Sequence, residues 1–463
     1  MKTVILWYRN DLRVNDLPAL AEAAKADFVV PVFIFNQALL HGIHASSNRN
    51  RFLLECLEDL KTSLKSLGAD LTLRRGKPEE VLLKLMKETG ASEVIYTEDF
   101  SPYAVERDRR IADVILANGG RFTQMPGRLA IDSFDDLVTG SGGPYKVFTP
   151  FWRKWGMAPR RDIAALPAAL HIPNNLEIGA LPTLADITTQ EDLALNPLKG
   201  GEMAARDRVK SWLQSGIHDY ATTHDLVGRD ATSRLSSYLH FGCLSVRELE
   251  TLCPEGEGPA AWHRQLCWRD FYHYIMKHFP ANADLEYQER YRDMDWSYDK
   301  TLLQAWKDGQ TGYPIVDAAM HQLLAEGWMH NRARLIVGSF LTKDLGLDWR
   351  LGEQHFMHHL LDGDQANNNG NWQWIASVGV DPAPIFRRLY NPTRQQERYD
   401  EDGVYVRKYV PELAQVPLQY LSQPSKMTEA EQKAADCIIG QDYPAPIVDH
   451  AKMRDEALAR YRR

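Results

Sequence analysis

The most constraining feature of this sequence is a change in its hydrophobic period near residue 125. Before that point, short runs rich in β-branched and aromatic residues alternate with stretches of helical spacing. The predicted strands are residues 3–7, 28–35, 71–74 and 93–97, and the predicted helices are residues 50–67, 78–88 and 104–118. Strands that alternate with helices in this way predict a parallel βαβ sheet.

After residue 125 the pattern changes twice. Residues 126–200 are punctuated by Pro, Gly and Ser, which predicts a long connection between domains. Beyond residue 200 almost every stretch has helical spacing: 206–214, 235–240, 258–278, 301–308, 315–326, 331–345, 349–361 and 449–462. We therefore predict a Rossmann-like α/β domain over residues 1–125, a linker over 126–200 and an all-α domain over 201–463.

The segment after the first predicted strand limits the ligand of the α/β domain. It reads YRNDLR at residues 8–13 and contains no Gly-x-Gly-x-x-Gly fingerprint. A nicotinamide dinucleotide site is therefore disfavoured, although another ligand could bind at the carboxyl ends of the strands.

The composition is that of a soluble globular protein, with 44% hydrophobic and 25% charged residues. No apolar run approaches the roughly 18 residues of a membrane helix, and the first residues hold too short a run for a signal peptide. The cysteines are odd in number and form no Cys-x-x-Cys pair, which favours free thiols: Cys56, Cys243, Cys253, Cys267 and Cys437. We expect a cytoplasmic monomer with neither a metal site nor a membrane partner.

Tryptophan is concentrated in one part of the helical region. Eight of the twelve tryptophans lie within residues 262–374, at positions 262, 268, 296, 306, 328, 349, 372 and 374. A large helical core is the simplest explanation. Residues 361–374 indicate more than a core, because consecutive Asn residues and a Gly are poor helix interior and predict a polar site.

Two features of this region predict how its side chains are used. On a helix, Trp372 and Trp374 diverge by about 200°, so one indole can face a buried ligand while the other lines a separate surface. The Arg334 guanidinium needs an acceptor if its helix is buried, and Asp362 and Asp364 are the expected partners.

Five motifs, in this order, resemble those of the photolyase/cryptochrome family of flavoproteins: WYRNDLR at 7–13, GYPIVDAAM at 312–320, WMHNR at 328–332, NWQWI at 371–375 and FRRLYNP at 386–392. The match runs over essentially the whole chain. The resemblance implies an α/β antenna domain followed by an all-α domain that holds FAD. It also implies light-driven repair of cyclobutane pyrimidine dimers in UV-damaged DNA, as in bacterial photolyases, or light signalling, as in cryptochromes.

The resemblance also assigns the FAD site residue by residue. The phosphate and ribose cradle would consist of Tyr220, Thr232, Ser233, Arg234, Leu235 and Ser236. Hydroxyls, backbone N–H groups and one Arg suit a pyrophosphate. The walls and partners of the isoalloxazine and adenine would be Trp262, Gln265, Arg269, Trp328, Asn331, Arg334, Asp362, Asp364 and Asn368.

The chemistry of the implied cofactor favours several of these residue types. The active form is the reduced, anionic flavin, whose charge needs a cation in a dry pocket, and Arg334 oriented by Asp362 fits that need. Asn368 matches the position that faces flavin N5. A carboxylate there is typical of plant cryptochromes, so the amide favours repair.

Further tryptophans match carriers and substrate walls of the family. Trp372, Trp349 and Trp296 match the chain that carries electrons from the surface to the flavin. Trp268 and Trp374 match the two walls that sandwich an extruded dimer, since photolyases are among the enzymes that flip bases out of the duplex.

Gln265 and Asn331 are the predicted catalytic positions at the dimer. Dimer-repairing members usually have Glu where this chain has Gln265, and an amide donates a hydrogen bond but supplies no proton. Gln at this site also occurs in (6-4) photoproduct enzymes, which are one alternative. Those enzymes place a catalytic His where this chain has Asn331, so cyclobutane dimers are favoured.

The antenna site departs from one branch of the family. Folate-binding members carry an Asn-Glu pair on the helix after the fourth strand, where this chain has Val105 and Glu106. The loss of the Asn favours a deazaflavin as second chromophore, or an empty site, over a folate.

DNA binding requires a local basic patch, because the net charge is −8. The expected rim around the substrate opening consists of Arg332, Arg387, Arg388, Arg394 and Arg398. A cryptochrome is the main alternative to a repair enzyme. Cryptochromes usually add a long tail or lose the substrate-pocket tryptophans, whereas this chain shows no such tail and keeps Trp268 and Trp374.

Overall fold

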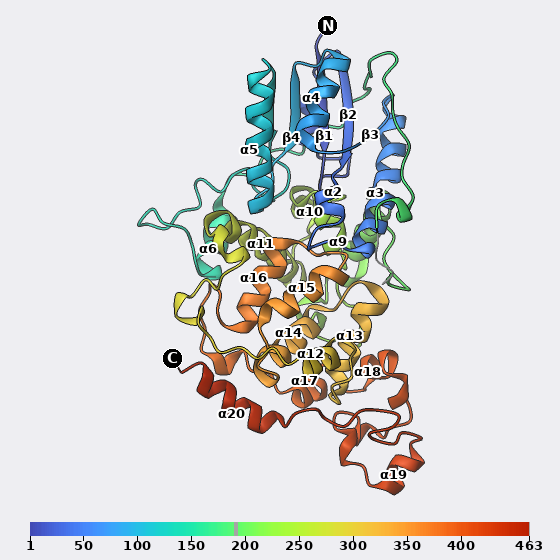
Figure 1. Ribbon diagram of the computed structural model, residues 1–463, viewed down its shortest axis with the longest axis vertical. Helices are drawn as coiled ribbons and strands as arrows, with labels where there is room; N and C mark the ends of the chain where they lie inside the picture. Colours follow the sequence, from blue (N-terminus) through green and yellow to red (C-terminus); the bar gives the residue numbers. More distant parts are fainter. Residues whose placement is uncertain (189–192, 463) are drawn as a thin grey trace.

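The N-terminal part is a parallel sheet covered by helices on both faces. A computed structural model describes residues 1–188 and 193–462 (Figure 1). The sheet has the strand order β3-β2-β1-β4-β5, and all its neighbouring strands are parallel. The strands are β1 (Thr3–Tyr8), β2 (Phe28–Phe35), β3 (Thr72–Arg75), β4 (Glu93–Thr97) and β5 (Arg121–Met125).

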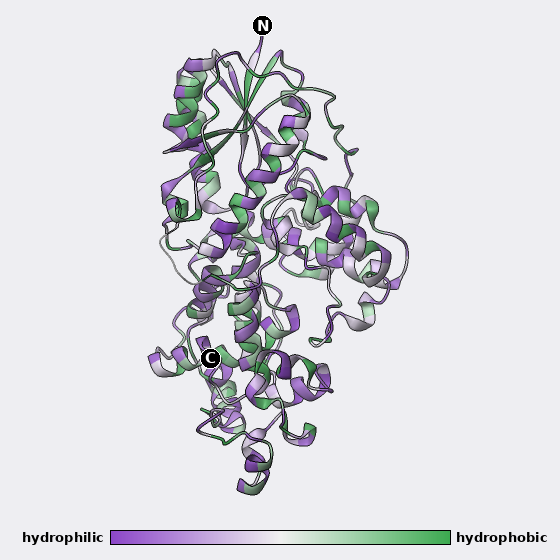
Figure 2. Cartoon of the chain, turned by 90° about the vertical axis from the view of Figure 1, so that its right-hand side faces the viewer, coloured by the Kyte–Doolittle hydropathy of each residue, from purple (hydrophilic) through white to green (hydrophobic). Residues whose placement is uncertain are grey.

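Alternation along the central strand β1 explains the two helical layers. Val4 and Leu6 are buried in a core shared with α1 and α3, whereas Ile5 and Trp7 are buried in a core shared with α4 and α5. The helices of this domain are α1 (Pro18–Ala23), α2 (Gln37–Leu40), α3 (Ser47–Ser66), α4 (Pro78–Thr89) and α5 (Pro102–Ala117). Figure 2 shows apolar segments, in green, and polar segments, in purple, among the strands of this domain.

Residues 201–462 contain helices and no named strand among the described residues, as predicted. The helices are α7 (Glu202–Ser211), α8 (Tyr220–Thr223), α9 (Ser236–His240), α10 (Val246–Leu252), α11 (Glu257–His278), α12 (Lys300–Lys307), α13 (Pro314–Glu326), α14 (Asn331–Ser339), α15 (Trp349–His359), α16 (Gln365–Ala376), α17 (Pro392–Tyr399), α18 (Val404–Tyr409), α19 (Glu429–Ala434) and α20 (His450–Arg460). Within the described residues, no helix is long and apolar enough to cross a membrane.

Several elements were not predicted from the sequence: strand β5, helix α6 (Phe148–Met157) and the short helices α1, α2, α8, α10, α17, α18 and α19. Strand β5 is an edge strand whose residues are half-buried or exposed, so it lacks the apolar run of its neighbours. Helix α6 lies inside the predicted linker and packs against α11. Phe148, Phe151 and Trp155 are its buried face. The linker therefore contributes a folded element that reaches the helical domain.

Helix α16 differs from the expectation for an Asn-rich run. Asp364 caps its first turn by accepting a hydrogen bond from the Asn367 backbone N–H at 2.9 Å. Asn371 Nδ2 donates to the Asn367 carbonyl at 2.8 Å. These bonds satisfy polar groups inside a regular helix, so the run continues to Ala376.

The thiols are free in the structure, and two of them meet between the domains. Cys56 on α3 and Cys243 after α9 are buried, with their Sγ atoms 3.4 Å apart. This contact helps to join the α/β domain to the helical part.

Candidate active site

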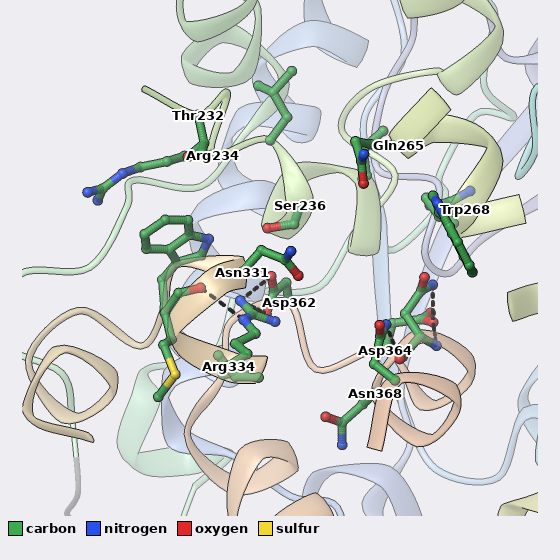
Figure 3. A pocket seen from close by; sticks show the side chains of 18 of the residues that line it. Thr232, Arg234, Ser236, Gln265, Trp268, Asn331, Arg334, Asp362, Asp364 and Asn368 are labelled. Atoms are coloured by element: carbon green, nitrogen blue, oxygen red, sulfur yellow. Dashed lines mark hydrogen bonds and ion pairs between the residues drawn. The ribbon is translucent and has the colours of Figure 1, made fainter. Parts of the chain in front are cut away.

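A cavity of about 480 Å³ lies among α8, α9, α11, α14 and α16. Every residue predicted to bind the cofactor lines it: Tyr220, Thr232, Ser233, Arg234, Leu235, Ser236, Trp262, Gln265, Arg269, Trp328, Asn331, Arg334, Asp362, Asp364 and Asn368. Figure 3 shows Ser236, Gln265 and Asn331, which come from different helices, around a common space. This set of hydroxyls, amides and charged groups suits a ligand with phosphates and a polar ring system.

Arg334 is held by one carboxylate. Its Nη2 donates to Asp362 Oδ2 at 2.9 Å, and its Nε donates to the Met329 carbonyl at 2.9 Å (Figure 3). The Asp362 side chain is almost fully buried. The pair presents an oriented cation to the cavity.

Asp364, the other expected partner of Arg334, pairs elsewhere. Its Oδ2 accepts from Arg128 Nη2 at 3.1 Å. Burial alone would raise the pKa of Asp364, but His273, His240 and Arg128 hold it well below its usual value. Asp364 is therefore an anion that joins the end of the cavity to the segment after β5, and Arg128 was missed because it lies in the predicted linker.

Arg234 forms ion pairs with two acidic side chains. Its Nη1 donates to Glu326 Oε2 at 2.9 Å and its Nε to Asp230 Oδ1 at 2.8 Å, while its guanidinium lies 4.3 Å from the centre of the Trp328 ring. The expectation that this Arg offers a free charge to a pyrophosphate does not hold in this conformation. The hydroxyls and backbone groups of residues 232–236 are left as the cradle.

Asn368 is oriented by a buried carboxyl that the sequence analysis missed. Its Nδ2 donates to the Glu353 carbonyl at 3.0 Å and to Glu353 Oε1 at 3.1 Å. The amide nitrogen is thus engaged, which leaves the amide oxygen as the acceptor for a ligand. Burial raises the pKa of Glu353 to about 7.

The raised pKa predicts a specific effect of pH on stability. The folded protein keeps a proton on Glu353 that the unfolded chain releases above the ordinary value of 4.5. The free energy of unfolding therefore falls by about 3 kcal/mol for this group as the pH rises from about 4.5 to about 7. Glu353→Gln removes this term, so its stability relative to the wild type should rise across that range and level off above it.

Urea unfolding at a series of pH values measures this difference. The exposed Glu429→Gln is the matched control and should show no such pH-dependent gain. A Glu353→Gln difference that stays constant from pH 4.5 to pH 7 would contradict the burial of a neutral carboxyl.

The predicted electron carriers occupy adjacent helices. Trp372 on α16 lines the cavity, and Trp349 lies on α15, which packs against α16. Gly352 on α15 leaves room for the Trp372 indole, because a Cβ at that position would collide with the ring. A further indole, Trp306, lies 6.2 Å from Trp372 between ring centres and is fully buried. Its place beside Trp372 is not visible in the sequence spacing.

The predicted third carrier, Trp296, lies in the segment before α12 and outside the lining of the cavity. It is 7% exposed and contacts the Tyr461 ring edge-on at 6.3 Å. Neither Trp296 nor Trp349 lines the cavity, which fits carriers that lead away from it.

The two predicted substrate walls border the cavity from two neighbouring helices. Trp268 lies on α11 and Trp374 on α16, and both are half-buried. Trp372 and Trp374 were predicted to face a buried ligand and a separate surface, whereas both residues line this one cavity. Gln265 lies on α11 beside the opening and is exposed.

The predicted basic rim is only partly at the surface. Arg387 and Arg394 are exposed, as expected. Arg388 is 2% exposed and lies beneath Trp374, so its expected contact with DNA does not hold in this conformation. Arg332 lines the cavity, and its Nε donates to Asp225 Oδ1 at 3.1 Å, which neutralises its charge.

Comparisons with known proteins agree over the full length. The family profile described as DNA photolyase matches residues 4–169, and the profile described as FAD binding domain of DNA photolyase matches residues 262–463. A deoxyribodipyrimidine photo-lyase of Streptomyces griseus is 40% identical over 468 residues, covering 100% of this chain and 99% of that protein. A solved bacterial class III photolyase from Agrobacterium tumefaciens has a TM-score of 0.92 at 33% identity, covering 100% of this chain and 97% of that one. A cryptochrome DASH of Natronomonas pharaonis is 36% identical, covering 97% of this chain and 98% of that protein.

Fold and cavity define a protein of the class in which an α/β domain precedes a helical, FAD-binding domain. The chain belongs to the DNA photolyase family. The predicted fold class and the predicted family are both confirmed.

Proposed function

We propose that this protein repairs cyclobutane pyrimidine dimers in UV-damaged DNA by light-driven electron transfer from reduced FAD. The observation that carries the proposal is one cavity in which the predicted cofactor residues meet the side chains of Trp268 on α11 and Trp374 on α16. When bound and reduced, FAD supplies the electron on absorbing light. The relatives of Streptomyces griseus and Synechococcus, at 40% and 35% identity, are named deoxyribodipyrimidine photo-lyase, which supports the same activity.

The residues around the flavin have distinct roles. Arg334, fixed by Asp362, provides positive charge to the cavity. Asn368 would offer its amide oxygen to a donor on the bound flavin, since Glu353 holds its nitrogen. Trp372, which lines the cavity, would pass electrons to a bound flavin that is oxidised.

The substrate residues act at the opening of the cavity. Trp268 and Trp374 stack against the flipped dimer, and base–aromatic stacking is worth about 1–3 kcal/mol per base. Gln265 and Asn331 donate hydrogen bonds to the pyrimidine carbonyls. Since Gln265 supplies no proton, repair depends on the electron alone, with these amides stabilising the charge on the dimer.

The proposed activity has a direct test. Oligothymidine that contains cyclobutane dimers is mixed with reduced protein, and the absorbance at 260 nm is followed. We expect recovery under near-ultraviolet or blue light and none in darkness. Recovery only with (6-4) products would favour that class of photolyase. A light-responsive flavin without repair of either lesion would favour a cryptochrome.

We expect exposed arginines beside the opening to contribute to DNA binding through phosphates. Arg387→Ala should weaken binding to damaged and undamaged DNA by similar factors, and should reduce the slope of log affinity against log salt by about 1. Lys433→Ala on α19, at the far end of the helical region in Figure 1, makes the same change in charge and is the control. Fluorescence anisotropy at several salt concentrations measures both. A loss confined to damaged DNA would instead place Arg387 on the lesion.

A second chromophore is proposed for the α/β domain, with a deazaflavin favoured over a folate. Val105 is exposed, and Glu106 is engaged with Arg109 at 2.9 Å on the surface of α5. Three buried polar atoms lie near the carboxyl ends of β1 and β4: Tyr8 Oη, Thr97 Oγ1 and Glu98 Oε1. None of them has a hydrogen-bond partner among the described residues, 1–188 and 193–462. Ligands of parallel sheets bind at such ends. Absorption spectra of chromophores extracted from the purified protein identify the antenna.

We further propose that the protein acts as a cytoplasmic monomer on single- or double-stranded DNA. Light scattering of the protein alone and with each kind of damaged DNA tests the oligomeric state and the strand preference.

A further inference from the structure

The two indole walls are each backed by a residue outside the cavity. Phe148, the first residue of α6, stacks on Trp268 with ring centres 3.6 Å apart and planes at 5°. Phe148 is 2% exposed, and α6 is anchored again by Trp155, whose Nε1 donates to Asp270 Oδ2 at 3.0 Å. Trp268 therefore cannot tilt away from the cavity unless Phe148 moves.

Trp374 is backed by a buried cation. The Arg388 guanidinium lies 4.0 Å from the centre of the indole. Its Nη1 donates to the Trp374 carbonyl at 3.0 Å, and its Nη2 donates to the Asp381 carbonyl at 2.6 Å. The fork of one Arg thus fixes both the ring and the backbone of Trp374 relative to Asp381.

A single backbone hydrogen bond connects these two supports. The Asp381 N–H donates to the Lys146 carbonyl at 2.8 Å, and Lys146 lies two residues before Phe148. Asp381 has a φ of 56°, a left-handed conformation that Asp tolerates better than most residues. We call Lys146, Phe148, Asp381 and Arg388 the bracket, because they form a continuous path from the back of Trp268 to the back of Trp374.

We propose that the bracket sets the spacing between the Trp268 and Trp374 indoles, so that its members are positioning residues for the dimer. The inference rests on the proposed function, in which the dimer binds between these rings. Dispersion falls steeply with separation, and a gap of about 0.5–1 Å already loses a quarter to a half of a contact. A wall without its support would relax by such amounts, and affinity for the dimer would fall while the flavin pocket stays intact.

Substitutions at Phe148 test the first support. Phe148→Leu removes the stacked ring, whereas Phe148→Tyr keeps it. We expect the dissociation constant for dimer-containing oligothymidine to rise about tenfold in Phe148→Leu and to change less than about twofold in Phe148→Tyr, as expected for a loss of about 1.4 kcal/mol. FAD content, photoreduction and affinity for undamaged oligothymidine should match the wild type in both.

A matched pair of substitutions at Arg388 tests the second support. Arg388→Met removes the charge and the fork, and Arg388→Lys keeps the charge alone. Both should weaken dimer binding, with Met the weaker binder. If Phe148→Leu fails to retain FAD, the Arg388 pair decides the proposal by itself.

Combining substitutions separates positioning from direct contact with DNA. In a Trp268→Ala background the bracket has no wall to hold on that side, so adding Phe148→Leu should cause no further loss. A further loss there, or unchanged dimer affinity in both Phe148→Leu and Arg388→Met, would overturn the bracket. A wild-type protein that neither binds nor repairs dimers would instead overturn the proposed function.

Discussion

In Trp372→Phe, we expect photoreduction of the oxidised flavin to fall more than about 100-fold, which corresponds to a barrier higher by about 3 kcal/mol. Phenylalanine fills most of the space of the buried indole, but its ring is much harder to oxidise. Trp372 is the residue of the predicted chain that lines the cavity, and it adjoins both α15, which carries Trp349, and the ring of Trp306. Its loss therefore closes either route by which an electron reaches the flavin.

The same variant should repair dimers normally once its flavin has been reduced chemically. Repair then draws its electron from the flavin, without the tryptophans. Bleaching of the flavin absorbance under blue light with an external reductant measures photoreduction, and the 260 nm assay measures repair. Trp7→Phe removes a buried indole on strand β1 of the α/β domain, outside the helical domain that holds this route, and is the control. Persistence of photoreduction in Trp372→Phe would show that electrons enter elsewhere.

The sequence was sufficient for the architecture wherever a periodic pattern carried the information. Each of the four predicted strands and three predicted helices of the α/β domain is matched by an observed element, because each of them buries a regular face. Strand β5 lacks such a face, since the edge of the sheet leaves it half-exposed. Helix α6 was hidden by the Pro and Gly residues on either side of it.

The residues of the site were predicted from the sequence, but most of their interactions were not. Motifs identified which residues line the cavity, because those residues lie in short strings that the family shares. Of their charge partners, Asp362 was predicted for Arg334, whereas Glu326 and Arg128, the partners of Arg234 and Asp364, come from distant segments and were not predicted. Arg234 pairs with Glu326, and Arg388 turns inward beneath Trp374, so neither offers the free charge that its position in a motif suggested.

The identity of the charge partner matters most for buried charges, because the stability of a buried ion depends more on its partner than on the residue itself. Breaking a buried ion pair by removing one member costs about 3–5 kcal/mol, because the other charge is left without compensation. Arg334 and Asp362 form a partly buried pair, with side chains 25% and 5% exposed, so the lower end of this range applies. A ligand bound in the cavity beside this pair would experience the electric field of the oriented Arg334 guanidinium.

Arg334→Met should therefore have two separable effects. The free energy of unfolding should fall by about 3 kcal/mol, since Asp362 loses its cation. FAD affinity should fall by about 100-fold or more, and the protein should purify nearly colourless. Arg334→Lys keeps the charge without the two-point hydrogen bonding, so it should retain part of both properties.

The double variant Arg334→Met/Asp362→Leu distinguishes structural from electrostatic roles. Removing both charges should restore most of the lost stability, because no unpaired carboxylate remains. It should leave the reduced form of any bound flavin disfavoured, so the midpoint potential of the flavin should be lower than in the wild type. Urea unfolding, flavin absorbance and a redox titration measure the three quantities. An Arg334→Met protein with normal stability, full FAD content and an unchanged potential would show that the cavity does not depend on this cation.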